Sequence, residues 1–360
     1  QQHEFPGLGY ALFDHQSTGP IAQNVVVFPY RQNQLEIYDQ FVCNDGNYYV
    51  MGKEFYPVNM NFPISPTNRT FAQIRLFHVV NDQFKEIDIQ QNNAMIQEIK
   101  LNKDKDGMLI CTGLYAENLV SGLRGIFYMK INPETEEVLL QRRIPFTAEF
   151  LTSANAAWER NWSERFFAGQ NRDTGLDLVK MHAVQPTKDG GIIAIAENQN
   201  ILYVPRNMNS ENVRFDWVYY FDDVIVYKLD AHGNLVWVRR VPKNQESRND
   251  DGYGLSIAHA ITENNVYFFY NDNSRNYDNQ GNFIPTGRLF NGTHRVIGNV
   301  IGSVTINNET GNVTRTMMPG RNELRAHFLP SKARVDQENN VMILYANRNR
   351  NHRFARVELR

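Results

Sequence analysis

The sequence predicts an all-β protein in which a four-stranded sheet repeats along one chain. Three observations support this. Tyr, Phe, Val and Ile are abundant and gather in short runs separated by Asn and Gly, a composition typical of strands and turns. Alternating runs are joined by polar turns such as Asp-Gly, a strong short-range signal of a β-hairpin. Two kinds of hairpin phrase also alternate along the whole chain.

The first kind of phrase is an alternating run, a polar turn and a strongly apolar run. It occurs as QLEIYDQFVCNDGNYYVMGK, AMIQEIKLNKDKDGMLICTG, VKMHAVQPTKDGGIIAIAEN, GLSIAHAITENNVYFFYND and SKARVDQENNVMILYAN. The turns of these phrases lie near Gly46, Gly107, Gly190, Asn264 and Asn339. The repeat is therefore longer than the roughly 40 to 50 residues of common blade repeats, and we expect insertions in its loops.

The second kind of phrase follows the first each time. It occurs as IRLFHVVNDQFKEIDI, IFYMKINPETEEVLLQRRI, VIVYKLDAHGNLVWVRRV and IGSVTINNETGNVTRTMM, and in shortened form as FARVELR at the C-terminus. Two hairpins make one four-stranded sheet, and radial repetition of such sheets makes a β-propeller. We therefore predict a single propeller domain over residues 1–360, with about five blades. The alternatives are a large β-sandwich and two stacked domains.

The ends of the chain predict how the ring closes. The last repeat has three expected strands, Lys332–Asp336, Val341–Ala346 and Phe354–Leu359. An unpaired edge strand is an aggregation hazard. The N-terminal run Asn24–Tyr30 precedes the first phrase and has no hairpin partner of its own, so we predict that this N-terminal strand closes the last blade.

One segment, residues 147–177, does not have the strand pattern. Its Trp158, Trp162 and Phe166 follow one another at intervals of four residues, which is a helical stripe. We predict one short helical insertion here, although a sixth, degenerate blade would also fit in this segment. The stripe is either packing or a partner-docking face, so Trp158 and Trp162 are binding candidates.

The bulk composition excludes several classes of protein. The formal net charge is -2 and the pI is about 6.6, so no strong field attracts nucleic acid or an anionic membrane. No apolar run approaches the ~20 residues of a membrane-spanning helix. Two cysteines, Cys43 and Cys111, lie in apolar strand-like runs and are expected to be buried free thiols rather than a bridge.

The motifs of catalysis and metal binding are missing, so we predict no cofactor and no metal. There is no G-x-S-x-G, no H-E-x-x-H and no zinc spacing. Asn102–Gly107 resembles the start of a calcium loop, but Gly113 stands where a bidentate Glu is required, so a hairpin turn is expected. His182 and His259 hold similar places before the first strands of neighbouring repeats. They are channel candidates for a metal or a proton transfer, or simply packed histidines of the repeat.

The loop Tyr270–Asn282 is too rich in Asn and Asp to be a strand by its composition. Its carboxylates and amides could bind a cation or a sugar, or the loop could be a solvated excursion. Its candidate binding residues are Asn271, Asp272, Asn273, Arg275, Tyr277 and Asp278. Long loops on a rigid scaffold commonly bind partners, and we expect contacts near Tyr56–Arg69, Asn200–Trp217 and Asn271–Thr293.

The stretch VYKLDAHGNLVWVRRV resembles the repeat of PQQ-like bacterial β-propellers, in which KLD..G...W ends one strand and starts the next. Trp237 is the Trp of that repeat, whereas Leu139 or Leu140, and Val313, replace it elsewhere. Quinoproteins of that family usually have eight blades and keep the Trp in most of them, so these departures argue against PQQ binding.

The whole chain also resembles exported β-propellers of Bacteroidota, by its Gln start, its Asn- and Tyr-rich strands and the phrase FFYNDNSRN. It lacks the C-terminal β-sandwich signal of many type IX secretion cargo proteins. The resemblance implies a periplasmic protein whose signal peptide has been removed, and an accessory that caps or plugs the type IX translocon.

The function expected from these observations is non-enzymatic. We predict a scaffold that docks on a larger protein, by the resemblance an outer-membrane export complex, with no nucleic-acid partner and no membrane-spanning segment. The alternative is a carbohydrate-active hydrolase or lyase that uses the central channel with His182 and His259. Fold alone does not decide between them.

Overall fold

The structure is a computed structural model, and it describes most of the chain. Described are residues 7–13, 19–30, 34–43, 47–56, 71–80, 83–89, 95–117, 123–151, 179–206, 214–284, 289–293, 297–320, 324–348 and 350–359. The chain divides into two compact units, Gln1–Leu119 with Gly125–Arg143, and Val120–Arg124 with Ile144–Arg360. The predicted all-β class is confirmed, because antiparallel strands make up almost all of the secondary structure.

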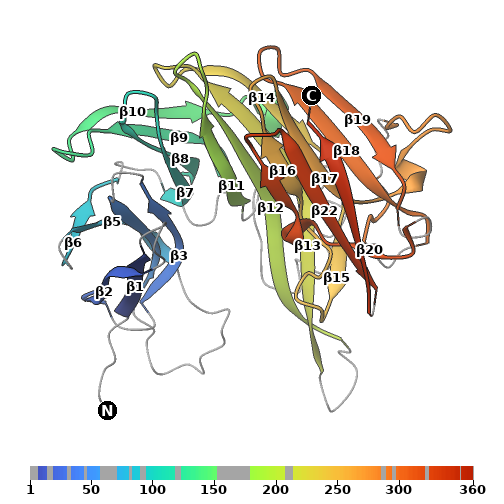
Figure 1. Ribbon diagram of the computed structural model, residues 1–360, viewed down its shortest axis with the longest axis horizontal. Helices are drawn as coiled ribbons and strands as arrows, with labels where there is room; N and C mark the ends of the chain where they lie inside the picture. Colours follow the sequence, from blue (N-terminus) through green and yellow to red (C-terminus); the bar gives the residue numbers. More distant parts are fainter. Residues whose placement is uncertain are drawn as a thin grey trace. The chain divides into compact units, whose positions relative to one another are not determined.

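The described residues of the first unit form three antiparallel sheets, in which each strand pairs with the next one along the chain (Figure 1). The two-stranded sheet consists of β1 (Gly7–Phe13) and β2 (Pro20–Val27). The next consists of β3 (Leu35–Val42), β4 (Tyr48–Phe55), β5 (Phe71–Val80) and β6 (Gln83–Ile87). The third consists of β7 (Met95–Lys103), β8 (Leu109–Ala116), β9 (Leu123–Ile131) and β10 (Val138–Pro145).

Three antiparallel sheets are also described in the second unit. One has β11 (Val179–Pro186), β12 (Ile192–Pro205), β13 (Phe215–Leu229) and β14 (Leu235–Val241), with β15 (Glu246–Arg248) pairing on β13. The next has β16 (Ala258–Ile261), β17 (Asn265–Asn273), β18 (Asn299–Asn307) and β19 (Val313–Met318). The last has β20 (His327–Phe328), β21 (Arg334–Asp336), β22 (Val341–Arg348) and β23 (Asn351–Glu358).

Helical structure is slight in the described part of the chain. Residues 148–151 form one helical turn, and two 3₁₀ turns, η2 (Ser274–Asn276) and η3 (Pro330–Lys332), interrupt loops. The helical turn at residues 148–151 lies at the start of the predicted helical insertion. The rest of that insertion, with Trp158 and Trp162, lies outside the described residues.

The predicted hairpins are confirmed. The five first phrases form the pairs β3–β4, β7–β8, β11–β12, β16–β17 and β21–β22, and the second phrases supply the strands that follow. Middle strands are buried on both faces, as in β8, where all eight residues are buried. This burial explains why the apolar runs in the sequence are continuous there rather than alternating.

The Asp-x-x-Gly element of the second phrase closes its hairpin by a specific set of hydrogen bonds. The Asp230 carboxylate accepts from the N–H groups of His232 (2.9 Å) and Asn234 (2.8 Å), and Gly233 has a φ of +72°. Only glycine adopts that φ at little cost. Asp104 accepts in the same way from Asp106 and Met108, which confirms the prediction that Asn102–Gly107 is a hairpin turn.

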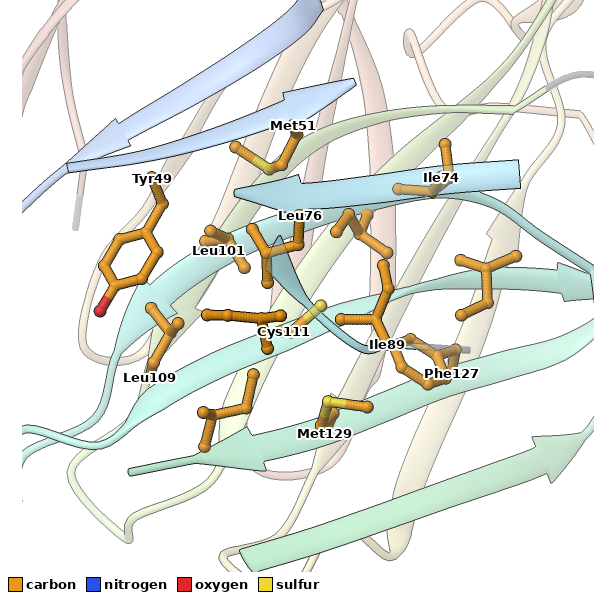
Figure 2. Packing of buried hydrophobic residues seen from close by; sticks show 14 of the residues in the cluster. Tyr49, Met51, Ile74, Leu76, Ile89, Leu101, Leu109, Cys111, Phe127 and Met129 are labelled. Atoms are coloured by element: carbon orange, nitrogen blue, oxygen red, sulfur yellow. The ribbon is translucent and has the colours of Figure 1, made fainter. Parts of the chain in front are cut away.

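The sheets of each unit pack face to face through apolar clusters. Between the second and third sheets of the first unit, Leu76 of β5 shares one apolar cluster with residues of the third sheet, among them Leu101, Cys111, Phe127 and Met129 (Figure 2). Both cysteines are free and buried, as predicted. Burial raises the pKa of the Cys111 thiol far above its usual value, because the thiolate would lose its hydration.

Trp237 joins two sheets of the second unit and is a packing residue. Its side chain is 5% exposed and lies in the cluster shared by the β11–β15 and β16–β19 sheets. Its indole Nε1 donates to the carbonyl of Asn308 at 3.1 Å. A Cβ on Gly311 would lie 2.9 Å from the indole ring, so the neighbouring turn approaches Trp237 closely only because it has a glycine there.

The prediction that Asn24–Tyr30 closes the last sheet is wrong. β2 pairs with β1, from Gly7↔Val27 to Phe13↔Pro20, and Val26 and Phe28 pack on the β3–β6 sheet. A strand close in sequence costs less loop-closure entropy than one at the other end of the chain. The sequence pattern did not predict β1 because Gly7 and Gly9 lower its strand propensity.

The last sheet has four strands, with β22 in its centre. β20 and β21 both pair with β22, at its two ends, and β23 pairs with its other edge. The short β20 has no counterpart among the three strands expected there. The described chain therefore has six sheets, four of them with the consecutive four-strand order that the repeat predicts.

Candidate functional site

The two predicted histidines lie close together in the second unit. His182 belongs to β11 and His259 to β16, the first strands of two adjacent sheets that share an apolar core. Their ring centroids are 5.6 Å apart and the rings are tilted by 57°. Both lie on the first strand of their sheet, although His259 pairs regularly with Phe268.

His182 occupies a β-bulge. Met181 pairs with Ala196 and Ala183 with Ile195, which leaves His182 as the extra residue. Bulges change the direction of a side chain and are frequent beside functional sites. The first strands β3 and β7 have a similar register shift, between Ile37 and Asp39 in the former, so the bulge belongs to the repeat and is not evidence of function by itself.

A fully buried carboxylate holds His182 in place. Nε2 of His182 is 2.9 Å from Oε2 of Glu197, whose side chain is 0% exposed. The same Oε2 accepts from Nε2 of Gln199 and from Oγ of Ser256, both at 2.6 Å. The Lys243 ammonium, also 0% exposed, lies 2.7 Å from the other oxygen, Oε1. We call these five residues the Glu197 cluster.

The Glu197 carboxylate is ionised at neutral pH. Burial alone would raise its pKa, but the charge of Lys243 and the hydrogen bond and charge of His182 outweigh burial and hold the pKa far below its usual value. An ionised carboxylate only accepts hydrogen bonds, so Nε2 of His182 must carry a proton. In the neutral imidazole, Nδ1 is then the nitrogen with a free lone pair.

Lys243 has no donor left for chemistry on a substrate. Besides Glu197, its ammonium donates to the carbonyl of Phe221 (2.6 Å) and to Oε1 of Gln245 (2.8 Å). An ammonium has three donors; two of them are used in these hydrogen bonds, and the ammonium is also held in the ion pair with Glu197. Any chemistry of this site therefore falls on the two imidazoles.

Ser256 is held in an unusual backbone conformation, with a φ of +73°. A non-glycine residue in this region stores strain of order 1 kcal/mol or more. Two hydrogen bonds retain it, because the Ser256 N–H donates to Gln245 (2.9 Å) and its hydroxyl donates to Glu197. Strain of this kind is common at functional sites.

The Asn- and Asp-rich segment forms a second buried polar cluster. Oδ2 of Asp272 accepts from Nη2 of Arg315 and from the hydroxyl of Tyr277, both at 2.7 Å. Asn276 donates to Oδ1 of Asp272, also at 2.7 Å. Arg315 lies 3.6 Å from the ring centroid of Phe283. We call these five residues the Asp272 cluster; its hydrogen bonds are made within the protein.

The predicted binding residues of this segment are mostly buried. Asn271 and Asp272 are at most 1% exposed, and Asn273 caps the turn η2. The prediction that Tyr270–Asn282 is too polar for a strand was wrong for its first four residues, since β17 runs to Asn273. Buried amides are tolerated there because they are satisfied, as when Asn271 donates to the carbonyls of Gly254 and Phe328.

Only two of those candidates reach the surface. Arg275 is exposed, with its guanidinium 3.6 Å from the centroid of the Phe290 ring. Asp278 is half-buried and accepts from the N–H groups of Gln280 and Asn282 in a hairpin turn. Tyr277 lies in the Asp272 cluster, where burial and then the charge of Asp272 raise its pKa.

An exposed apolar surface lies on the far ends of β12 and β13, which extend past the rest of their sheet (Figure 1). Ile201, Tyr203 and Phe215 are 46%, 43% and 46% exposed. Tyr203 lies opposite Trp217 in the ladder, and its ring stacks on Phe215 with centroids 4.8 Å apart. We call Ile201, Tyr203, Phe215 and Trp217 the aromatic face.

The reverse side of the same two strands is buried. Leu202, Val204, Val218 and Tyr220 form one apolar cluster and are at most 5% exposed. β15 adds a third strand along β13 there, and Arg206 forms an ion pair with Asp216 near the end. The aromatic face is therefore supported by packed structure.

Sequence reasoning missed the residues that make the histidine site polar. Glu197, Gln199, Lys243 and Ser256 were not singled out, because they come from three separate segments of the chain and belong to no motif. The one available signal is Glu197, a charge that directly follows the apolar run IIAIA, since a carboxylate there must be paired or exposed.

In the described ranges, no group of three or more His, Cys, Asp or Glu residues is placed to hold a metal ion. Within the same ranges, no helix has the length and apolar character to span a bilayer.

No family model and no curated protein matches the chain. Among solved structures, the polysaccharide lyase Uly1 is 9% identical over 96% of this chain and 74% of that chain, with a TM-score of 0.40. The B. megaterium levansucrase is 11% identical over 94% and 84%, with a TM-score of 0.33. The luciferin-regenerating enzyme is 12% identical over 74% of this chain and 64% of its own length, also with a TM-score of 0.33. Likenesses this distant decide neither the fold in detail nor the chemistry.

Proposed function

We propose that the protein is a non-catalytic binding protein, a single β-propeller that docks on a larger protein through the aromatic face. The repeat supports the propeller, because consecutive meander sheets pack face to face within each unit. Five of the described sheets contain the phrases from which we predict blades, and the β1–β2 pair packs on the first of them.

The aromatic face is the observation that supports docking. Single exposed apolar residues are ordinary, but a contiguous patch marks an interaction surface. Tyr, Trp and Phe are enriched in protein interfaces and dominate their hot spots. Here Tyr203, Trp217 and Phe215 are neighbours on one sheet surface, and a rigid surface loses little entropy on binding.

The partner predicted from the sequence resemblance is an outer-membrane protein export complex, with the chain in the periplasm. Its location and the identity of its partner stay predictions. The aromatic face adds a physical constraint, because it lies within Asn200–Trp217, one of the three contact regions expected from the sequence. A partner should therefore bring an apolar surface to β12 and β13.

The test is purification of the tagged full chain from its source cells, followed by direct binding to the purified partner. We expect a stoichiometric partner, and Tyr203→Ser with Phe215→Ser to weaken its binding about 30-fold or more, the loss typical of a hot spot of about 2 kcal/mol. The matched control is Val236→Ser with Val313→Ser, since these valines are 49% and 41% exposed on β14 and β19.

Two outcomes would reject this proposal. One is a chain that purifies from its own cells as a monomer without any stoichiometric partner. The other is a partner whose affinity falls equally in the variant and the control. Circular dichroism of both double variants should match the wild type, because all four residues are surface side chains.

A second candidate function is a carbohydrate-active hydrolase or lyase. The observation that favours it is the contact between His182 and His259 above the ionised Glu197, since an oriented imidazole can act as a general base. Turnover of polysaccharide that is lost on His182→Ala and kept in the Tyr203→Ser, Phe215→Ser variant would favour it over docking.

A further inference from the structure

We propose that His182 and His259 bind one first-row transition-metal dication, of the class of Zn²⁺, Ni²⁺ or Cu²⁺, with exogenous ligands in its remaining positions. Imidazole nitrogens suit these borderline metals, whereas Mg²⁺ and Ca²⁺ prefer oxygen. The inference is independent of partner docking, because it rests on the first strands β11 and β16 and not on the aromatic face.

The spacing of the two rings fits a shared ion. A metal–nitrogen bond of about 2.0–2.1 Å places each ring centroid roughly 3.2 Å from the metal, so two such rings lie at most roughly 6.4 Å apart. The observed 5.6 Å is within that limit. It corresponds to a nitrogen–metal–nitrogen angle of roughly 120°, close to the tetrahedral geometry that zinc prefers.

His182 is prepared as a ligand before any metal arrives. Metal-binding histidines usually donate their second ring N–H to a carboxylate, which fixes the tautomer and increases the basicity of the ligating nitrogen. The Nε2–H of His182 donates to Glu197 in this way at 2.9 Å. That leaves Nδ1 as the nitrogen able to ligate.

The environment holds this arrangement rigidly. Glu197 is fixed by Gln199, Ser256 and Lys243, so His182 has a carboxylate partner that cannot rotate away. Lys243 balances the charge of Glu197, so the ion would meet two imidazoles over a neutral pair. Ala183 and Ile261 anchor β11 and β16 in one apolar cluster, which keeps the two imidazoles at a fixed separation.

Two protein ligands leave open positions on the ion. In the described ranges no further His, Cys, Asp or Glu completes the set, so water or a ligand from outside these residues fills the remaining positions. Open positions are the mark of a metal that can bind or activate another molecule. We expect an affinity in the micromolar range rather than that of a closed structural zinc site.

The experiment is titration of the metal-stripped full chain with Zn²⁺ by calorimetry, repeated with Co²⁺ for its visible absorption. We expect one ion per chain, and His182→Ala and His259→Ala each to weaken binding at least tenfold. His232→Ala is the matched control, because His232 lies in the exposed β13–β14 turn, and it should bind as the wild type does.

A positioning variant separates this site from adventitious binding. Glu197→Gln should weaken Zn²⁺ binding about 10- to 100-fold, the usual cost of losing such a carboxylate. If that variant fails to fold, Ser256→Ala removes one hydrogen bond to Glu197 and should weaken binding by a smaller factor. Absence of bound Zn²⁺, or equal affinity in His182→Ala, His259→Ala and the control, would overturn the proposal.

Discussion

Two of the buried acid–base pairs of the second unit, Arg315–Asp272 and Lys243–Glu197, differ in what surrounds them. In the Asp272 cluster, Arg315 is enclosed by the rings of Tyr270, Tyr277 and Phe283. In the Glu197 cluster, the hydrogen bonds lead from Lys243 through the carboxylate to His182, on the first strand of its sheet. A buried charge pair by itself is therefore no evidence of a site. What distinguishes the two clusters is whether the hydrogen-bond network of the charge pair leads to a side chain that can bind a ligand, as His182 can in the proposed metal site.

The largest expected effect breaks the enclosed pair. Arg315→Met leaves Asp272 buried without its cation, which should lower the free energy of unfolding by about 3–5 kcal/mol. Adding Asp272→Asn should restore part of that loss. Urea unfolding of the two variants measures this. If Arg315→Met were neutral, the Asp272 cluster would not be a structural clamp.

The next effect concerns acid sensitivity and the Glu197 cluster. The folded pKa of Glu197 lies below its unfolded value of 4.5, so its stabilisation is present above pH 4.5 and is lost as pH falls below it. Its contribution to the slope of stability with pH is at most about 1.4 kcal/mol per unit. Unfolding between pH 3 and 6 should show a flatter slope in Glu197→Gln, Lys243→Met than in the wild type.

The smallest effect compares single hydrogen bonds in the two clusters. Tyr277→Phe and Ser256→Ala each remove one hydroxyl donor to a buried carboxylate, which should cost about 1.5–3 kcal/mol of stability. Only Ser256→Ala should also change Zn²⁺ affinity. Equal Zn²⁺ affinity in both variants would remove the proposed difference between the clusters.

Local signals made the fold largely predictable. The Asp-x-x-Gly turns, the apolar second strands and the alternation of two phrases set the hairpins, because hairpin register depends on residues close in sequence. The pairing of β2 was not predictable in that way. Gly7 and Gly9 hid β1, and with β1 hidden, Asn24–Tyr30 had no local partner.

The candidate site was predictable only in part. His182 and His259 were found because they recur at one place in the repeat, and the structure brings their rings together. Lys243 and Ser256 gave no such signal, since they reach Glu197 from different segments. The aromatic face was expected as a contact region, but its exposure depends on which side of β12 is packed.

The sequence by itself determined most of the hairpin strands, their turns and the free, buried state of Cys43 and Cys111, since these follow from residues close in sequence and from hydrophobic patterning. Only the tertiary structure decided which polar side chains are paired inside the protein and which are placed where they could bind a ligand. The sequence predicted Asp272 as a binding residue, but its carboxylate is buried and bonded to Arg315. No sequence motif indicated a role for Glu197, which orients His182. The physical reason is that the free energy of a buried charge depends on partners that packing brings from distant segments.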